Sequence, residues 1–162
     1  MSEERDGFYV FPERAKTKLR KAYMEKQPVY IYGMVGYGKT ALVEQFLGKK
    51  KYIYFDAASS PLACLEDLHT QSILVVDNLQ FLEDEFVKDR LLELIRQPDL
   101  WLIFISRSKC PGWLIGAYLK YRNFCTITET DLELSEEEIR SYLKGRGIEE
   151  YGPNDVRFVQ SY

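Results

Sequence analysis

The chain has 162 residues, enough for one domain with a substantial hydrophobic core. Its hydrophobic content of 46% and its charged content of 29% are ordinary for a soluble globular protein. A formal net charge of −3 provides no global basic field, so composition gives no reason to expect nucleic-acid binding by this segment. The charged N-terminal residues and the lack of a long apolar run indicate neither a signal peptide nor a membrane-spanning helix, and we expect a cytoplasmic protein.

The cysteines and the histidine argue against further classes of site. Cys64, Cys110 and Cys125 are odd in number and form no C-x-x-C pair, which favours reduced thiols over a disulfide framework. His69 is the only histidine, so a Ser-His-Asp site or a histidine-rich metal site would have to depend on it. Neither residue type therefore indicates the function of this chain.

Helix-like and strand-like stretches alternate along the chain. The first, over 13–26, places Ala15, Leu19 and Ala22 on one face of a helix. The run at 72–77 is rich in β-branched residues and leucine, as in a strand buried on both faces of a parallel sheet. Predicted strands cover 29–32, 51–56, 72–77, 100–105 and 124–128, and predicted helices cover 41–47, 61–69, 82–97 and 113–119.

Local signals refine these helices. Ser60 is the predicted N-cap of the helix at 61–69, and Ser135 with Glu138 forms a capping box that begins one further helix. The helix at 82–97 carries an apolar stripe at helical spacing, which we expect to be buried. That stripe comprises Leu82, Phe86, Val87, Leu91, Leu94 and Ile95.

This alternation predicts a three-layer α/β fold, in which helices cover both faces of a mainly parallel sheet of five strands. Three regions are expected: a lead-in and helix over 1–28, a core over 29–134, and the truncated start of a helical region over 135–162. Ligands in such sheets bind at the carboxyl ends of the strands. A glycine-rich stretch, Asp77 and Arg107 all come at such ends, so we expect a single site there.

The most specific motif lies between the first strand and the helix that follows it. Residues 33–40 read Gly-Met-Val-Gly-Tyr-Gly-Lys-Thr and fit G-x-x-x-x-G-K-[ST], the P-loop pattern. Backbone N–H groups of such a loop surround phosphate oxygens, while the lysine reaches the β- and γ-phosphates and the hydroxyl binds Mg²⁺. The predicted nucleotide-binding residues are Gly33, Val35, Gly36, Tyr37, Gly38, Lys39, Thr40 and Ala41.

Asp77 ends an apolar strand and has the form of a Walker B carboxylate, which holds Mg²⁺ opposite the P-loop hydroxyl. We therefore predict that Thr40 and Asp77 bind the metal. The next position, where a second acid would polarise the attacking water, is Asn78, and an amide cannot accept a proton. Three alternatives follow: Asn78 positions the water without accepting its proton, a carboxylate from residues 83–85 replaces the second acid, or hydrolysis is slow. We favour slow hydrolysis.

Two arginines are candidates for contact with the nucleotide. Arg107 follows the fourth strand, where it is either a surface residue or a sensor of the γ-phosphate, since a guanidinium is always charged and binds phosphate bidentately. Arg14, at the start of the first helix, would approach the nucleotide if that helix packs beside the P-loop. Tyr30, Tyr32, Tyr52 and Tyr54 lie in predicted strands, where we expect packing in the sheet rather than stacking on a base. The predicted catalytic residues are Lys39, Asp77, Asn78 and Arg107.

With these residues together, the chain resembles the NTPase domain of the STAND class of signal-transduction ATPases, in particular the group that includes the maltose-regulon activator and large ATP-binding LuxR-type regulators. The matching stretches are 33–40, 74–77 and 105–107. Residues 132–139 are similar to the segment that begins the next helix in that class. The resemblance extends from about Phe11 to Tyr162, and only the P-loop is specific by itself.

The resemblance implies an ASCE or AAA+-like P-loop NTPase with strand order 5-1-4-3-2 and with ATP, ADP and Mg²⁺ as ligands. It implies a switch that ADP holds closed, that ATP and an inducer open, and that then self-associates or meets partner proteins in the full-length chain. DNA binding would belong to a separate C-terminal domain. Asn78 departs from the second acid that is common in this class, and the chain stops at Tyr162, before the lid, as an excised domain would.

Two other functions stay open at this stage. A small P-loop kinase would need an acceptor site and a basic lid, and Arg107, Lys109, Lys120 and Arg122 supply basic residues in one segment. An interaction module with a vestigial P-loop would bind no nucleotide. We favour a nucleotide-dependent switch with slow ATP hydrolysis.

Overall fold

A computed structural model describes residues 12–33, 38–66, 68, 72–120, 123–133 and 135–145. Its centre is a five-stranded sheet in the order β2-β3-β4-β1-β5, and every neighbouring pair of strands is parallel. This confirms the predicted α/β class. It also confirms the predicted strand order 5-1-4-3-2, which is the same order read from the opposite edge of the sheet. The strands are β1 (Val29–Tyr32), β2 (Ile53–Asp56), β3 (Ile73–Asp77), β4 (Trp101–Ser106) and β5 (Cys125–Ile127).

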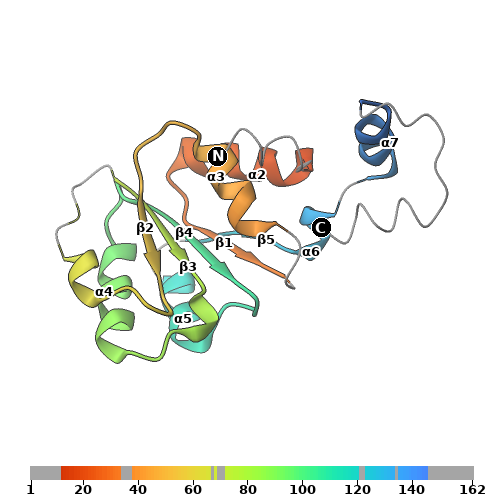
Figure 1. The fold of residues 1–162 in the computed structure, drawn as a ribbon. Coiled ribbons are helices and arrows are strands. Elements are labelled where there is room, and N and C mark those ends of the chain that lie inside the picture. Colours follow the sequence, from red (N-terminus) through yellow and green to blue (C-terminus); the bar gives the residue numbers. More distant parts are fainter. Residues whose placement is uncertain are drawn as a thin grey trace.

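Helices cover both faces of the sheet, as Figure 1 shows. Helices α2 and α3 lie against one face, and α4 and α5 lie against the other. Helix α7 extends to one side of the sheet. The helices are α2 (Glu13–Glu25), α3 (Lys39–Leu47), α4 (Glu85–Ile95), α5 (Gly112–Lys120), α6 (Glu129–Leu132) and α7 (Glu136–Gly145), with short 3₁₀ turns η1 (Leu62–Leu65) and η2 (Leu79–Phe81).

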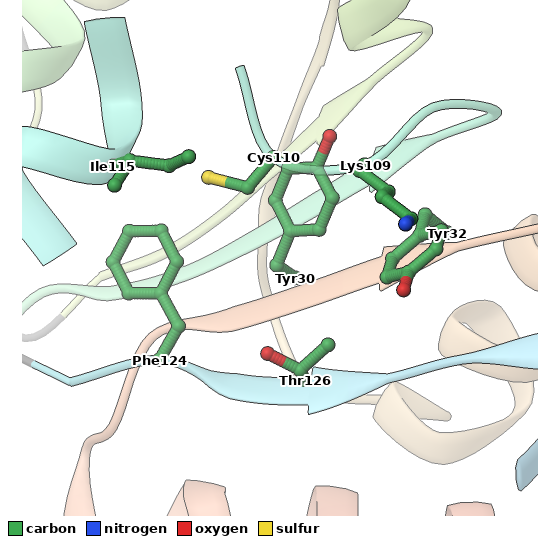
Figure 2. Close-up of a pocket in the computed structure, with 7 residues that line it drawn as sticks. All are labelled: Tyr30, Tyr32, Lys109, Cys110, Ile115, Phe124 and Thr126. Carbon is green, nitrogen blue, oxygen red and sulfur yellow. The ribbon is translucent and has the colours of Figure 1, made fainter. Parts of the chain in front are cut away.

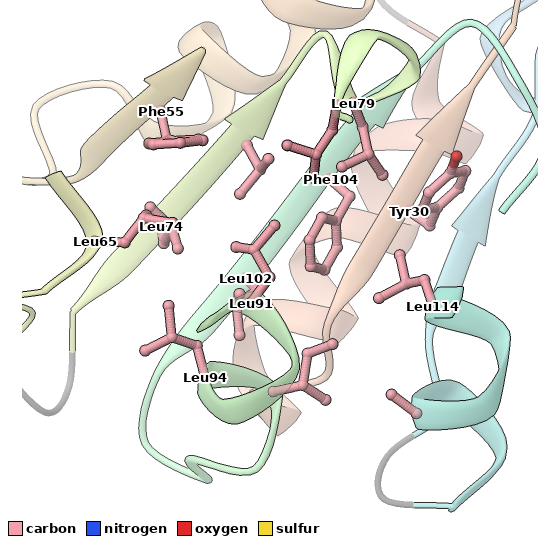
Figure 3. Close-up of a cluster of buried hydrophobic side chains, with 14 of the residues drawn as sticks. Tyr30, Phe55, Leu65, Leu74, Leu79, Leu91, Leu94, Leu102, Phe104 and Leu114 are labelled. Carbon is pink, nitrogen blue, oxygen red and sulfur yellow. The ribbon is translucent and has the colours of Figure 1, made fainter. Parts of the chain in front are cut away.

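The sheet separates two hydrophobic clusters because successive strand residues point to opposite faces. On the α2 and α3 face, the buried face of α2 packs with Trp101 and Ile103 of the central strand β4. On the other face, Tyr30, Phe104 and Leu102 pack under α4 and α5 (Figure 3). The strands β3 and β4 are buried at every position, which is why their sequences are apolar without alternation.

Helix α4 corrects one prediction about the core. The predicted buried stripe included Phe86, but that side chain is 74% exposed. The helix begins at Glu85 rather than Leu82, because the Asp84 carboxylate accepts hydrogen bonds from the backbone N–H groups of Phe86 and Val87 and caps it there. The other five residues of the predicted stripe are buried, so the prediction is wrong only at Phe86, in the first turn of the helix.

The segment after β2 gives a second correction. Instead of a helix over 61–69, the described part holds the 3₁₀ turn η1, and the Ser60 side chain does not cap it. The Ser60 hydroxyl accepts a hydrogen bond from the Asp56 backbone N–H, so it closes the turn that follows β2. The predicted capping box of Ser135 and Glu138 is present, with both hydrogen bonds formed. Across the described ranges, every helix is too short or too polar to cross a bilayer.

Candidate nucleotide-binding site

The site lies where β1 passes into α3. Gly33 follows the last residue of β1, and Gly38 occupies the N-cap position of α3 with φ at 67°, a left-handed conformation that favours glycine. The Leu42 backbone N–H donates to the Gly38 carbonyl and begins the helical ladder of α3. The predicted contacts of Val35, Gly36 and Tyr37 lie outside the described residues.

Gly33 is close to helix α6. A Cβ atom at Gly33 would lie 2.9 Å from Cγ of Glu129 and 3.7 Å from Cδ1 of Leu132, so a larger residue there would displace the Glu129 side chain. The short helix α6 is itself fixed by a capping box in which Thr128 and Asp131 bond reciprocally. The first glycine of the P-loop pattern therefore serves here as the contact between β1 and α6.

Lys39 is the first residue of α3, and its Nζ atom donates to the Gly33 carbonyl oxygen at 2.9 Å. Burial lowers the pKa of this ammonium group, and the nearby Arg107 charge lowers it further, against the opposing effects of Asp77 and Glu129. The influence of Arg107 and Asp77 on Lys39 shows that the three predicted residues share one electrostatic environment.

Thr40 and Asp77, the predicted metal ligands, are in direct contact. The Thr40 hydroxyl donates to Oδ2 of Asp77 at 2.9 Å. The Tyr54 hydroxyl, from β2, donates to the same oxygen at 2.6 Å, and the Asn78 backbone N–H donates to Oδ1 at 2.8 Å. Burial raises the pKa of Tyr54, and the bond to Asp77 raises it further because the carboxylate needs the phenol proton.

Asn78 does not point its amide freely toward the phosphate loop. Its Nδ2 atom donates to Oδ1 of Asp56, 3.1 Å away at the end of β2, and its backbone has φ at 57°. In the register of the parallel pair, Asp56 stands opposite Asp77. The Ala58 backbone N–H and the Asn78 amide, which both donate to this carboxylate, lower the pKa of Asp56, so it is ionised at neutral pH.

The alternative acids considered from sequence lie elsewhere. Asp84 is occupied as the N-cap of α4. Glu85 is exposed and forms a surface ion pair with Lys88 one turn along that helix. Asp56 is the acid to which the Asn78 side chain donates.

Arg107 follows β4 at the same edge of the sheet. Its backbone N–H donates to Oε1 of Gln80, and its guanidinium lies 5.5 Å from the centre of the Phe81 ring, a cation–π contact. The η2 turn that carries Gln80 and Phe81 comes directly after Asp77 and Asn78. The loop bearing Arg107 is thus tied to the segment that carries the acid.

Arg14 lies at the start of α2 and is anchored to α6, where its Nη1 atom donates to the Thr130 carbonyl at 3.3 Å. Because α6 also contacts Gly33, Arg14 is on the side of the domain that borders the P-loop. Ala41 packs against the apolar cluster on the α2 and α3 face. Nucleotide contacts of both residues stay predictions.

Sequence reasoning missed Tyr54, Asp56 and Glu129 as neighbours of the site. Tyr54 was expected to pack within the sheet, but its side chain is 44% exposed and its hydroxyl contacts Asp77. A signal existed for α6, since Thr128 and Asp131 have the spacing of a capping box. Tyr54 and Asp56 belong to no motif, and their contacts depend on the register in which β2 pairs with β3.

Comparisons with known proteins agree with this fold. No protein-family model and no curated protein matches the chain. Among solved structures, it is similar to the Aeropyrum pernix Orc1 protein in complex with DNA, with a TM-score of 0.54, 17% identity, and coverage of 85% of this chain and 50% of that one. It is also similar to the Walker-type ATPase paby2304 of Pyrococcus abyssi, with a TM-score of 0.56, 12% identity, and coverage of 92% and 62%.

A third similar structure is Drosophila ORC bound to DNA, with a TM-score of 0.52, 16% identity, and coverage of 93% of this chain and 50% of that one. The chain therefore spans between 50% and 62% of the length of these three proteins. At such identities the similarity shows the fold alone. The chain has the fold of P-loop NTPases.

Proposed function

We propose that this chain is a nucleotide-binding switch domain that binds ATP or ADP with Mg²⁺ and hydrolyses ATP slowly. The observation that carries the proposal is the contact between Thr40 and Asp77, 2.9 Å apart, beside the half-buried Lys39 at the start of α3. This is the pair of oxygen ligands that Mg²⁺ takes from a P-loop protein, next to the cation that meets the phosphates.

The residues fit such a ligand by their chemistry. Lys39 and the first N–H groups of α3 would hold phosphate oxygens, and the positive end of the helix dipole favours the same charge. Thr40 and Asp77 would hold Mg²⁺, which, when bound, neutralises phosphate charge and polarises the phosphoryl oxygens. Arg107 supplies a second cation at the same edge of the sheet, and its contact with the γ-phosphate would distinguish ATP from ADP.

Slow hydrolysis follows from the environment of Asn78. A general base must take the proton of the attacking water, and the Asn78 amide is instead donating to Asp56. Two backbone or amide donors already occupy the Asp56 carboxylate and lower its pKa, so it is a weak base. The site therefore retains nucleotide better than it consumes it, which is the property of a switch.

The wider assignment is part of the same proposal. An origin in a larger, transcriptional regulator rests on the sequence resemblance to the STAND class, and it is compatible with a chain that spans 50% to 62% of its structural neighbours. The regulator would act in the cytoplasm, and self-association or partner proteins would transmit the nucleotide state.

Calorimetric titration with ADP and with a non-hydrolysable ATP analogue, each with Mg²⁺, tests the proposal. Lys39→Ala removes charge-assisted bonds worth about 1.5–3 kcal/mol each, so affinity should fall about 10- to 100-fold. Lys49→Ala, at an exposed lysine just beyond α3, is the matched control and should bind as the parent chain does. Equal affinity in the Lys39 and Lys49 variants would refute the phosphate site.

Turnover separates the switch from a kinase. The proposal expects slow release of inorganic phosphate from ATP and no faster transfer to an added acceptor. Multiple-turnover transfer to nucleosides, nucleotides or small metabolites, well above the rate of hydrolysis, would establish the kinase instead. The absence of binding to either nucleotide at millimolar concentration would favour an interaction module.

A further inference from the structure

A pocket of about 320 Å³ opens on the opposite face of the sheet from α3 (Figure 2). It lies between β1, β5 and the start of α5. This volume is at the lower end of the range for small-molecule sites. The lining residues are Tyr30, Tyr32, Lys109, Cys110, Ile115, Phe124 and Thr126.

The chemistry of the lining is aromatic and weakly cationic. Three of the seven residues are aromatic, one is a lysine, and none is acidic. The Tyr30 hydroxyl is used internally, since it donates to the Ser108 carbonyl at 2.8 Å, so its ring acts as a fixed wall. Burial raises the pKa of Cys110 to about 11, which keeps that thiol neutral at physiological pH. Lys109 is therefore the ionised group of the lining.

The pocket shares two segments with the phosphate site. Tyr30 and Tyr32 belong to β1, and Gly33 follows Tyr32 directly. Lys109 and Cys110 lie in the loop that begins with Arg107, and the Tyr30–Ser108 bond ties that loop to β1. A molecule held between Lys109 and the β1 rings would thus contact both the strand before the P-loop and the loop that carries Arg107.

We propose that this pocket binds a small aromatic carboxylic acid, and that its occupancy changes nucleotide affinity at the P-loop. The aromatic rings and Ile115 accept a planar apolar body by stacking and edge contacts. The Lys109 ammonium group selects an anionic substituent at the rim. The binding part of this proposal stands by itself, whereas the coupling part rests on the proposed nucleotide function.

Binding is tested by ¹⁹F NMR titration with 4-(trifluoromethyl)benzoate and with the neutral 4-(trifluoromethyl)benzamide, which has nearly the same shape. The benzoate should bind more tightly than the amide by about 3- to 10-fold, as for a partly exposed charged contact. Lys109→Met should remove that difference while leaving amide binding unchanged. Lys49→Met, on the other face of the sheet, is the matched control and should preserve it.

Location is tested by filling the pocket. Ile115→Trp places a bulky indole ring at the rim, where the parent side chain is 42% exposed, and it should abolish binding of both probes. Met24→Trp, at an exposed position of α2, adds the same indole ring elsewhere and should have no effect. Binding that survives Ile115→Trp, or no binding of the benzoate up to 10 mM (about the weakest affinity the assay detects), would overturn the site. Equal affinity for the amide would overturn the assignment of an acid.

Coupling is measured as the ADP dissociation constant with and without saturating benzoate, and a change of about fivefold or more is expected. The change should vanish in the Ile115→Trp variant. If ADP binds with unchanged affinity while the benzoate occupies the pocket, the coupling is wrong. If the benzoate binds and ADP does not bind at all, the nucleotide function fails and the pocket assignment stands.

Discussion

Replacement of Tyr54 by phenylalanine isolates the least expected contact of the site. The substitution keeps the ring and removes only the hydroxyl that donates to Oδ2 of Asp77 at 2.6 Å. Asp77 is 6% exposed and keeps its donors from Thr40 and the Asn78 backbone, so the carboxylate loses one of three described hydrogen bonds.

The magnitude follows from the charge and the exposure of this pair. A hydrogen bond to a charged group contributes about 1.5–3 kcal/mol. Tyr54 is 44% exposed, so water can replace part of the lost bond, and the lower end of that range applies. We expect the free energy of unfolding to fall by about 1.5 kcal/mol, which for a chain of this size lowers the melting temperature by about 3–6 °C.

Urea unfolding at neutral pH measures this difference, with Tyr52→Phe as the control. Tyr52 lies just before β2 and is partly buried against the hydrophobic cluster on the α2 and α3 face, so its variant loses a hydroxyl without affecting Asp77. A second measurement uses pH. Because the folded-state pKa of Tyr54 lies above its ordinary value of about 10, its stabilising effect is complete below pH 10 and is lost as pH rises above it.

The Tyr54→Phe variant should therefore lose less stability than the parent chain above about pH 10. Equal unfolding free energies for the Tyr54 and Tyr52 variants would refute the reasoning. So would an alkaline stability profile that the Tyr54 substitution leaves unchanged. Either result would mean that the Tyr54 hydroxyl gains no stability from its hydrogen bond to Asp77 over a hydrogen bond to water.

Three further predictions concern other parts of the chain. Asn78→Asp places a carboxylate against Asp56, so it should lower the free energy of unfolding by about 1–3 kcal/mol. The double variant Asp56→Asn, Asn78→Asp restores the hydrogen bond and should restore the stability. Faster ATP hydrolysis by that double variant would show that the missing acid limits turnover. Asp131→Asn should cost about 1.5 kcal/mol at pH 7 in thermal unfolding. Burial acts to raise the pKa of Asp131, but the Lys18 ammonium group at 2.8 Å and the Thr128 N–H hold it below its ordinary value; its contribution is therefore present above about pH 4 and lost below, and the variant should have a flatter acid limb. Phe86→Ser should change stability by less than about 0.5 kcal/mol, because a side chain that is 74% exposed buries little; a loss of several kcal/mol would restore the stripe predicted from sequence.

The fold was predictable because its signals are local. Fully apolar runs mark β3 and β4, and the P-loop pattern marks the junction of β1 and α3. Helix boundaries were less predictable because a single cap decides them, as the Asp84 carboxylate does for α4. The apolar spacing identified the buried face, but it also included Phe86, which lies in the first turn after the cap and is exposed.

Site residues that belong to a sequence motif could be predicted, whereas those that reach the site only through strand pairing could not. Thr40 and Asp77 belong to motifs, and the structure places them in contact. Tyr54 and Asp56 belong to a strand whose sequence indicates only a sheet position. They reach Asp77 and Asn78 because β2 pairs with β3 in a register that sets Asp56 opposite Asp77. The apolar pattern does not fix that register, because β3 is buried at every position and has no alternation of apolar and polar residues to align.

The site is internally satisfied, and this has a consequence for ligand binding. Lys39 donates to the Gly33 carbonyl, and Thr40 donates to Asp77. Across the described residues, no buried side-chain nitrogen or oxygen lacks a hydrogen-bond partner. Under the proposed function, a phosphate and its metal ion would exchange these bonds, so only the difference between old and new bonds would contribute to affinity. Under the proposed function, Lys39 would release the Gly33 carbonyl, which lies beside α6, so nucleotide binding would change a hydrogen bond of the protein as well as add new ones.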